Sequence, residues 1–263
     1  MKKKLLALGL VAISTVALAQ VSLFDMGLGT RAMGLGGAYA AVAEGPEGLL
    51  YNPAGLAQVR GITVDSTILA GWVGAGYVGA ALPSLGAGIG YLGTSAGENL
   101  GFSQLGLIAG FGMDLTGLGF PVLGGVGLRF QSTNIAGEGS TSFGLDIGVL
   151  GRWPSPLGEL RAALVIRELA FGGLSTEFVL AGAWTSPFGL LAAIDLTGEY
   201  VALGVGWNFL GTTEVRAGLR QEGGVFRIAF GLGVRVGTFN VDYALLTHPL
   251  LSPSHRFGFG MRF

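Results

Sequence analysis

The residues that could support catalysis in this chain are few and scattered. The run Gly93-Thr-Ser-Ala-Gly97 matches the G-x-S-x-G pattern that presents a nucleophilic serine between a strand and a helix. Two histidines, His248 and His255, could act as bases or as metal ligands together with Asp242. A loop and another strand-like run follow the serine, however, and no third ligand or nucleophile accompanies the histidines. The sequence therefore predicts a protein that is not an enzyme and has no catalytic, metal or cofactor site.

Glycine-rich runs near the N-terminus do not change this expectation. Gly27-Leu-Gly29 and Gly34-Leu-Gly36-Gly37 resemble dinucleotide-binding loops only in composition. Neither has the strand–loop–helix–strand context or the acidic ribose partner of such a loop. We interpret them as positions where the backbone must turn tightly or approach another segment closely.

The charged residues show a more regular arrangement. In many segments arginines alternate with apolar residues and share their parity with glycine, alanine or aspartate. We expect them to face a polar interior, because a lipid-facing arginine at mid-depth costs about 2–4 kcal/mol. This candidate lumen charge network comprises Arg129, Asp146, Arg161, Arg167, Arg216, Arg220, Arg227, Arg235, Asp242, Arg256 and Arg262.

Ion pairs between carboxylates and arginines are expected within this network. The planar guanidinium fork suits paired contacts with a carboxylate. Asp146 is expected opposite Arg129 or Arg161, and Asp242 opposite Arg256. Such pairs more often hold an interior together than select a substrate.

Period-2 alternation places these residues on β-strands. In the last segment Phe257, Phe259, Met261 and Phe263 share one parity, and Arg256, Gly258, Gly260 and Arg262 share the other. Turn residues divide the chain into expected strands at 61–72, 75–83, 86–94, 102–114, 122–133, 140–152, 159–168, 176–185, 189–197, 200–209, 213–221, 225–236, 238–246 and 254–263. Their length suits tilted membrane strands of roughly 9–11 residues. The expected fold is an all-β, transmembrane, antiparallel β-barrel of about 14 strands, although 12 would also fit.

The composition favours a membrane environment. Half of the residues are hydrophobic (50%), only 12% are charged, and the mean hydropathy is +0.62. A helical membrane bundle is a competing interpretation, because residues 66–97 carry no charge, but that stretch contains nine glycines and a proline. A soluble β-protein is the other alternative. It would not need apolar residues on the outer side of so many strands.

The first nineteen residues have the pattern of a secretory signal peptide. Three lysines precede an apolar run, and Ala17-Leu-Ala19 offers a cleavage site. Cleavage would leave 12 basic residues against 16 acidic ones, a net charge of −4. The chain then has no basic patch for nucleic acid. We expect export to the outer membrane, with residues 1–19 as the signal, 20–60 as an N-terminal hatch and 61–263 as the barrel.

The sequence pattern of the expected hatch differs from that of the strands that follow. Asn52 is a candidate N-cap and Pro53 a first helical residue, and residues 38–43 could form another helical turn. Arg31, Glu44 and Glu47 are expected to contact the arginine-lined wall. Inward-facing glycines of the strands would provide room for the segment. The hatch residues are Arg31, Gly34, Gly36, Gly37, Glu44, Glu47, Asn52, Pro53, Ala54 and Gly55.

Two parts of the chain resemble a known family. The segment from Gly29 through Leu50-Tyr-Asn-Pro-Ala-Gly-Leu-Ala57 is similar to the N-terminal hatch of FadL-like outer-membrane proteins, particularly the PorV/PorQ branch. The ending His255-Arg-Phe-Gly-Phe-Gly-Met-Arg-Phe263 resembles the last strand of that branch. The resemblance implies a fourteen-stranded barrel with the hatch inside, and Phe263 as the insertion signal read by the barrel-assembly machinery.

The resemblance also implies two possible roles. FadL-like members pass long-chain fatty acids or other hydrophobic compounds across the outer membrane. PorV-like members act in type IX protein secretion, which would require a partner protein, for instance at residues 247–254 with Leu250 and Leu251. The expected partners are therefore outer-membrane lipid, the assembly machinery, and either hydrophobic small molecules or a secretion protein.

Overall fold

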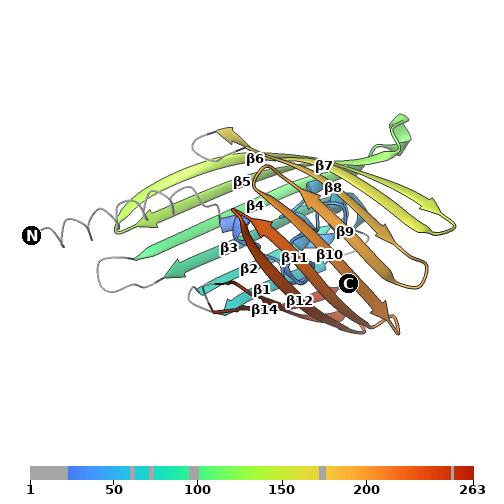
Figure 1. The fold of residues 1–263 in the computed structure, drawn as a ribbon. Coiled ribbons are helices and arrows are strands. Elements are labelled where there is room, and N and C mark those ends of the chain that lie inside the picture. The colour runs from blue at the N-terminus through green and yellow to red at the C-terminus, as the bar shows by residue number, and fades with distance from the viewer. Residues whose placement is uncertain (1–22, 60–62, 71–73, 95–100, 172–175, 250–251) are drawn as a thin grey trace, which may run out of the picture.

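The structure is a computed structural model that describes residues 23–59, 63–70, 74–94, 101–171, 176–249 and 252–263. Short helical elements come first in the chain and strands follow (Figure 1). The helical elements are η1 (Leu23–Met26), α2 (Thr30–Gly34), α3 (Gly45–Gly48), η2 (Pro53–Gln58) and η3 (Thr116–Leu118). The strands are β1 (Thr63–Ala70), β2 (Gly74–Leu82), β3 (Leu85–Thr94), β4 (Phe102–Asp114), β5 (Val122–Ile135), β6 (Glu138–Ser155), β7 (Gly158–Phe171), β8 (Glu177–Thr185), β9 (Leu190–Leu196), β10 (Tyr200–Phe209), β11 (Thr213–Glu222), β12 (Val225–Val236), β13 (Phe239–Leu246) and β14 (Ser254–Arg262).

Each strand pairs antiparallel with its neighbours in the sequence, and β1 also pairs with β14. The described strands therefore form one sheet that closes on itself into a barrel. The helical elements at the start of the chain overlap the strands in the middle of the view in Figure 1, where they lie against the inner wall. The prediction of an antiparallel, all-β fold is confirmed.

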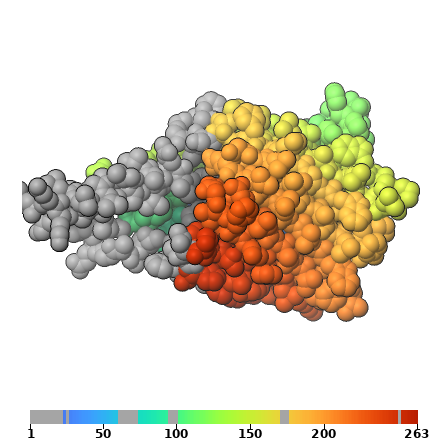
Figure 2. Space-filling view, viewed as in Figure 1, coloured from blue at the N-terminus to red at the C-terminus, as the bar shows by residue number. Residues whose placement is uncertain are grey.

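The two faces of the strands differ as the alternation predicts. In β10 the burial pattern alternates from Tyr200 to Trp207, with Ala202 fully buried and Leu203 and Val205 exposed. Outward positions throughout the barrel are mainly leucine, valine, isoleucine and phenylalanine. Figure 2 shows the strands near the C-terminus as one continuous face without a hollow. Within the described residues, no helix is both long enough and apolar enough to cross a membrane.

β6 and β7 exceed their expected lengths by the largest margin. The expected ranges 140–152 and 159–168 correspond to β6 at Glu138–Ser155 and β7 at Gly158–Phe171. Their register shifts between Leu145 and Ile147, where β7 carries one extra residue. At this bulge Arg167 and Glu168 together lie opposite Asp146, so the alternation of β7 shifts by one residue.

The N-terminal segment, residues 23–59, is almost entirely buried. The η2 element packs on β4, β5 and β6, and α2 packs on β12 and β13. Residues 38–43 do not form a helix; they contain a single turn closed by a 2.9 Å hydrogen bond from Val42 N–H to Tyr39 O. Gly36 and Gly37 have the left-handed backbone expected of them, with φ of 69° and 91°, whereas Gly34 ends helix α2.

Candidate functional site

The N-terminal segment and the inner wall of the barrel together form the candidate site. Asn52 is the residue around which its last helical turn is built. Its Oδ1 accepts a 3.0 Å hydrogen bond from Ala54 N–H, as the N-cap prediction requires, and Pro53 is the first residue of η2. Its Nδ2 donates to Ala40 O at 3.0 Å and to Val149 O of β6 at 3.5 Å. One fully buried side chain thus caps η2, holds the preceding turn and contacts the wall.

Glycines on the inner wall make room for this segment. A Cβ at Gly125 of β5 would overlap the backbone of Pro53 and Ala54, and one at Gly148 of β6 would overlap the Asn52 side chain. On the other side of the barrel, a Cβ at Gly218 would overlap the backbone of Leu35 and Gly36. Such close backbone approach is a reason for glycine within strands.

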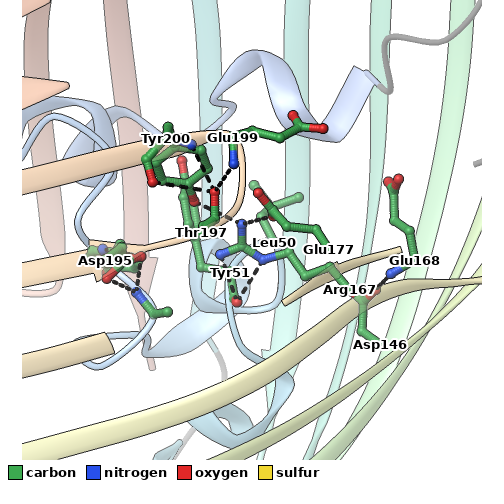
Figure 3. A network of polar contacts seen from close by, with 12 residues as sticks. Leu50, Tyr51, Asp146, Arg167, Glu168, Glu177, Asp195, Thr197, Glu199 and Tyr200 are labelled. Carbon is green, nitrogen blue, oxygen red and sulfur yellow. Dashed lines mark hydrogen bonds and ion pairs between the residues drawn. The ribbon is translucent and has the colours of Figure 1, made fainter. Parts of the chain in front are cut away.

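Arg167 fastens the middle of the segment to the wall (Figure 3). Its Nε and Nη2 donate to the backbone oxygen of Tyr51 at 3.2 and 3.1 Å. Its Nη1 bonds the Glu177 carboxylate at 3.0 Å and the Tyr200 hydroxyl at 3.1 Å. This arginine on β7 therefore links the segment to β8 and to the start of β10.

A buried carboxylate holds the turn at residues 39–42. The Asp195 side chain on β9 accepts hydrogen bonds from Tyr39 N–H at 3.1 Å and from Ala40 N–H at 3.0 Å. Asp195 is fully buried. It therefore accepts hydrogen bonds from two backbone N–H groups that have no acceptor within a helix or strand of the segment.

Asp146 and Arg129 form the ion pair expected between neighbouring strands. Arg129 Nε lies 2.6 Å from Asp146 Oδ2, and Arg129 Nη2 donates to Leu50 O at 2.9 Å. The other oxygen of Asp146 accepts from the backbone of Glu168 at 2.9 Å, at the bulge where Glu168 has a φ of 54°. The pair therefore stabilises the wall irregularity and the segment at once. Arg161, the alternative partner, bonds Glu159 instead.

The prediction that Asp242 pairs with Arg256 is wrong. Asp242 Oδ1 accepts from Arg216 Nη1 at 2.6 Å, although β12 lies between their strands. The contact can pass over β12 because Gly233 has no side chain; a Cβ there would overlap both partners. Arg256 is buried, and its register partner on β13 is Ala244.

Ion pairs at one end of the barrel involve the N-terminal segment. Arg31 pairs with Glu44 within the segment and with Glu214 of β11 at 3.4 Å, and Arg262 of β14 reaches Glu44 at 3.3 Å. Burial raises the pKa of Glu44, but the charges of Arg31 and Arg262 outweigh it and lower this pKa to about 2. Glu47, also expected to contact the wall, accepts a hydrogen bond from Ala32 N–H at 2.7 Å.

These ion pairs border a small polar cavity. Its volume is about 50 Å³, and it is lined by Arg31, Glu44, Glu214, Arg216, Arg235 and Asp242 among others. Because roughly 10–15 Å³ of such space is enough to hold one water molecule, the cavity suits a few waters or a small polar group.

The remaining candidate residues lie as follows. Arg220 stacks 3.6 Å from the centre of the Tyr200 ring, and both it and Arg227 bond Glu222 at 3.2 and 3.0 Å. Arg235 and Phe263 are exposed at barrel ends. Gly55 lies against the backbone of Ala43, where a Cβ would overlap.

The catalytic candidates gain no support from the described residues. Ser95 and Gly97 lie outside those residues, as do residues 1–22, Leu250 and Leu251. His255 Nδ1 is 2.8 Å from the Tyr243 hydroxyl on the outer face. In the part of the chain that the structure describes, no three His, Cys, Asp or Glu residues are grouped as metal ligands.

Sequence reasoning missed three important polar residues. Asp195 and Glu214 also face the interior, but the lumen charge network predicted from the sequence contains only arginines and two aspartates. Tyr200 is the third, and its ring is buried between Arg167 and Arg220. The inward parity of Asp195 with Ala193 and Leu191 was the signal that could have identified it.

Two solved structures share this architecture. The Pseudomonas putida toluene transporter TodX matches with a TM-score of 0.58 and 11% identity, over 89% of this chain and 96% of TodX. A Pseudomonas aeruginosa FadL homologue matches with a TM-score of 0.53 and 11% identity, over 88% of this chain and 97% of that chain. This chain has their fold. No family model and no curated protein sequence matches it.

Proposed function

We propose that this chain is an outer-membrane protein that moves hydrophobic or amphipathic compounds across the outer membrane. In this proposal it is a fourteen-stranded transmembrane barrel, and residues 23–59 form a plug in its lumen. The observation that carries the proposal is the fit between the N-terminal segment and the inner-wall glycines. The pairing of β1 with both β14 and β2 supports the closed wall.

The outer and inner surfaces support a membrane location. Outward side chains are large and apolar, while the buried charges are paired inside. This distribution is typical of a barrel in lipid, where only the interior tolerates charge. The similarity of fold to a toluene transporter supports an apolar cargo by analogy.

Uptake measurements test this function. We expect cells that make the protein to take up labelled aromatic hydrocarbons or long-chain fatty acids faster than cells that lack it. A small polar solute serves as the control, because its uptake should change little while the plug stays in place. Equal uptake of every apolar compound in both strains would refute the proposal.

A role in protein secretion is the alternative from the family resemblance. The residues proposed for partner binding, Leu250 and Leu251, lie outside the described residues. No contact in the described part of the chain favours this role over transport.

A further inference from the structure

Three strands of the wall repeat one pattern on their inner face, a central glycine with an arginine towards each end of the strand. On β11, Gly218 lies between Arg216 and Arg220, and all three have the inward parity. The corresponding residues are Arg227, Gly231 and Arg235 on β12, and Arg256, Gly258 and Arg262 on β14. We call Gly218, Gly231 and Gly258 the seat glycines.

Helix α2 covers the three seat glycines. A Cβ at Gly218 would overlap the backbone that directly follows α2. A Cβ at Gly231 would lie 2.9 Å from the Cα of Gly34, which ends the helix. A Cβ at Gly258 would lie 2.8 Å from the hydroxyl oxygen of Thr30, which begins it. The lack of side chains on the wall therefore allows α2 to lie directly against it.

Arginines of the wall lie on both sides of α2. Towards the end of the barrel that holds the β10–β11 and β12–β13 turns, Arg216, Arg235 and Arg262 line the polar cavity together with Arg31 of α2. On the other side of α2 lie Arg220, Arg227 and Arg256, each within three residues of the opposite end of its strand. The cavity thus borders α2 on one side, and a second group of arginines borders it on the other.

The inner face of these strands has a positive net charge. The inward positions of β11–β14 carry the six arginines of this pattern and three carboxylates, those of Glu214, Glu222 and Asp242, which leaves a net charge of +3. On β5 and β6, by contrast, Arg129 is matched by Asp146. Because arginine-lined pores select anions, a path along β11–β14 would favour anions over cations.

Glycines on both sides of α2 provide hinges. Gly27 and Gly29 precede the helix and Gly36 and Gly37 follow it, all with positive φ between 69° and 103°. Small residues at the ends of an element often absorb the backbone changes of a hinge motion. The short helix between these hinges can therefore move away from the wall while the later part of the N-terminal segment keeps its contacts.

We propose that β11–β14 form a path for small inorganic anions such as chloride, and that α2 is its gate. While α2 lies on the seat glycines, the path is closed. When α2 moves away, the arginines on its two sides form one continuous positively charged lining. The inference rests on the proposed function only in that both require a barrel in a bilayer. It adds a second class of solute and the strands along which that solute passes.

Ion currents through the full-length protein in planar lipid bilayers test the gate. Gly218→Ala places a methyl group where the backbone after α2 lies, so this variant should conduct more than the wild type. In a KCl gradient its reversal potential should shift towards the equilibrium potential of chloride. Gly231→Ala has a smaller overlap with α2 and should change the current in the same direction. It keeps the test decisive if Gly218→Ala does not fold.

Arginine variants test the lining. In the background of either alanine variant, Arg227→Gln and Arg235→Gln each remove one positive charge, on opposite sides of α2, and should each reduce the preference for chloride. Arg161→Gln is the matched control, because it removes the same charge from β7, where Arg161 bonds Glu159. It should leave the preference unchanged.

Gly125→Ala is the control for the place of opening. Its Cβ would displace η2 from β5, on the part of the wall where Arg129 is matched by Asp146. Any current through this variant should therefore prefer chloride less than the current through Gly218→Ala does. An equal preference in both variants would contradict a path along β11–β14.

Three further results would overturn the inference. If both seat-glycine variants insert but conduct no more than the wild type, α2 is not a gate. A current without a preference for chloride would show that the arginines do not line the path, and a preference that survives both arginine variants would place the path elsewhere. These results would leave the proposed transport of apolar compounds intact. Failure of the protein to insert, checked by flotation with lipid vesicles, would overturn both proposals.

Discussion

Arg129 on β5 and Asp146 on β6 form a 2.6 Å ion pair whose side chains are each 1% exposed. The same two residues also reach the N-terminal segment, through Leu50, and the bulge of β7, through Glu168. A single buried pair thus couples the position of the segment to an irregularity in the wall.

Removing the carboxylate of this pair should be strongly destabilising. Asp146→Asn leaves the Arg129 charge buried without its closest anion, which costs about 3–5 kcal/mol of unfolding free energy. Denaturant unfolding of the protein in detergent or vesicles measures the loss. An Arg129→Met, Asp146→Leu double variant should lose less than Asp146→Asn. A single variant as stable as the wild type would contradict the structural role of the pair.

A methyl group at Gly125 should displace η2 from the wall. The Cβ of Gly125→Ala would overlap the backbone of Pro53 and Ala54, so we expect higher permeability to small polar solutes. Gly127→Ala, two residues along the same strand, is the matched control, since its Cβ would make an ordinary 3.4 Å contact with Asp146. Liposome swelling measures both variants. Equal swelling rates would show that η2 does not close the lumen.

Loss of the Asn52 side chain should loosen the whole N-terminal segment. Asn52→Ala removes the η2 cap, at about 0.5–2 kcal/mol, and leaves the carbonyl of Ala40 without its side-chain donor. Hydrogen exchange should become faster in residues 38–58. Asn134→Ala, which alters an exposed turn at Gly137, is the control and should leave that exchange unchanged. If hydrogen exchange became faster in η2 alone, Asn52 would act only as a cap.

Acid should weaken the contacts of Glu44. Its pKa is lowered from the ordinary 4.5 to about 2 because the charges of Arg31 and Arg262 outweigh the effect of burial. A lowered folded-state pKa gives stability that is present above about pH 4.5 and lost as the pH falls towards 2. Glu44→Gln should therefore reduce stability at pH 6 and flatten its dependence on pH between 4.5 and 2. An unchanged slope would assign the acid sensitivity to other carboxylates.

Much of the architecture could be predicted from the sequence. Period-2 alternation identified the strands because each residue on a strand faces either lipid or the interior, and the two surroundings select different side chains. The Asn52-Pro53 pair identified the start of η2, since capping depends on adjacent residues only. Lumen-facing arginines were also predictable, because lipid excludes their charge.

Only the tertiary structure decided which charged groups meet. Asp242 contacts Arg216 across Gly233 rather than Arg256, because a glycine allows a long side chain to pass over the intervening strand. Asp195 binds backbone donors that a folded turn, not a sequence motif, brings together. The bulge at Glu168 likewise depends on the register of two strands. Alternation therefore determined which face each residue occupies, whereas strand register and the packed N-terminal segment determined its partner.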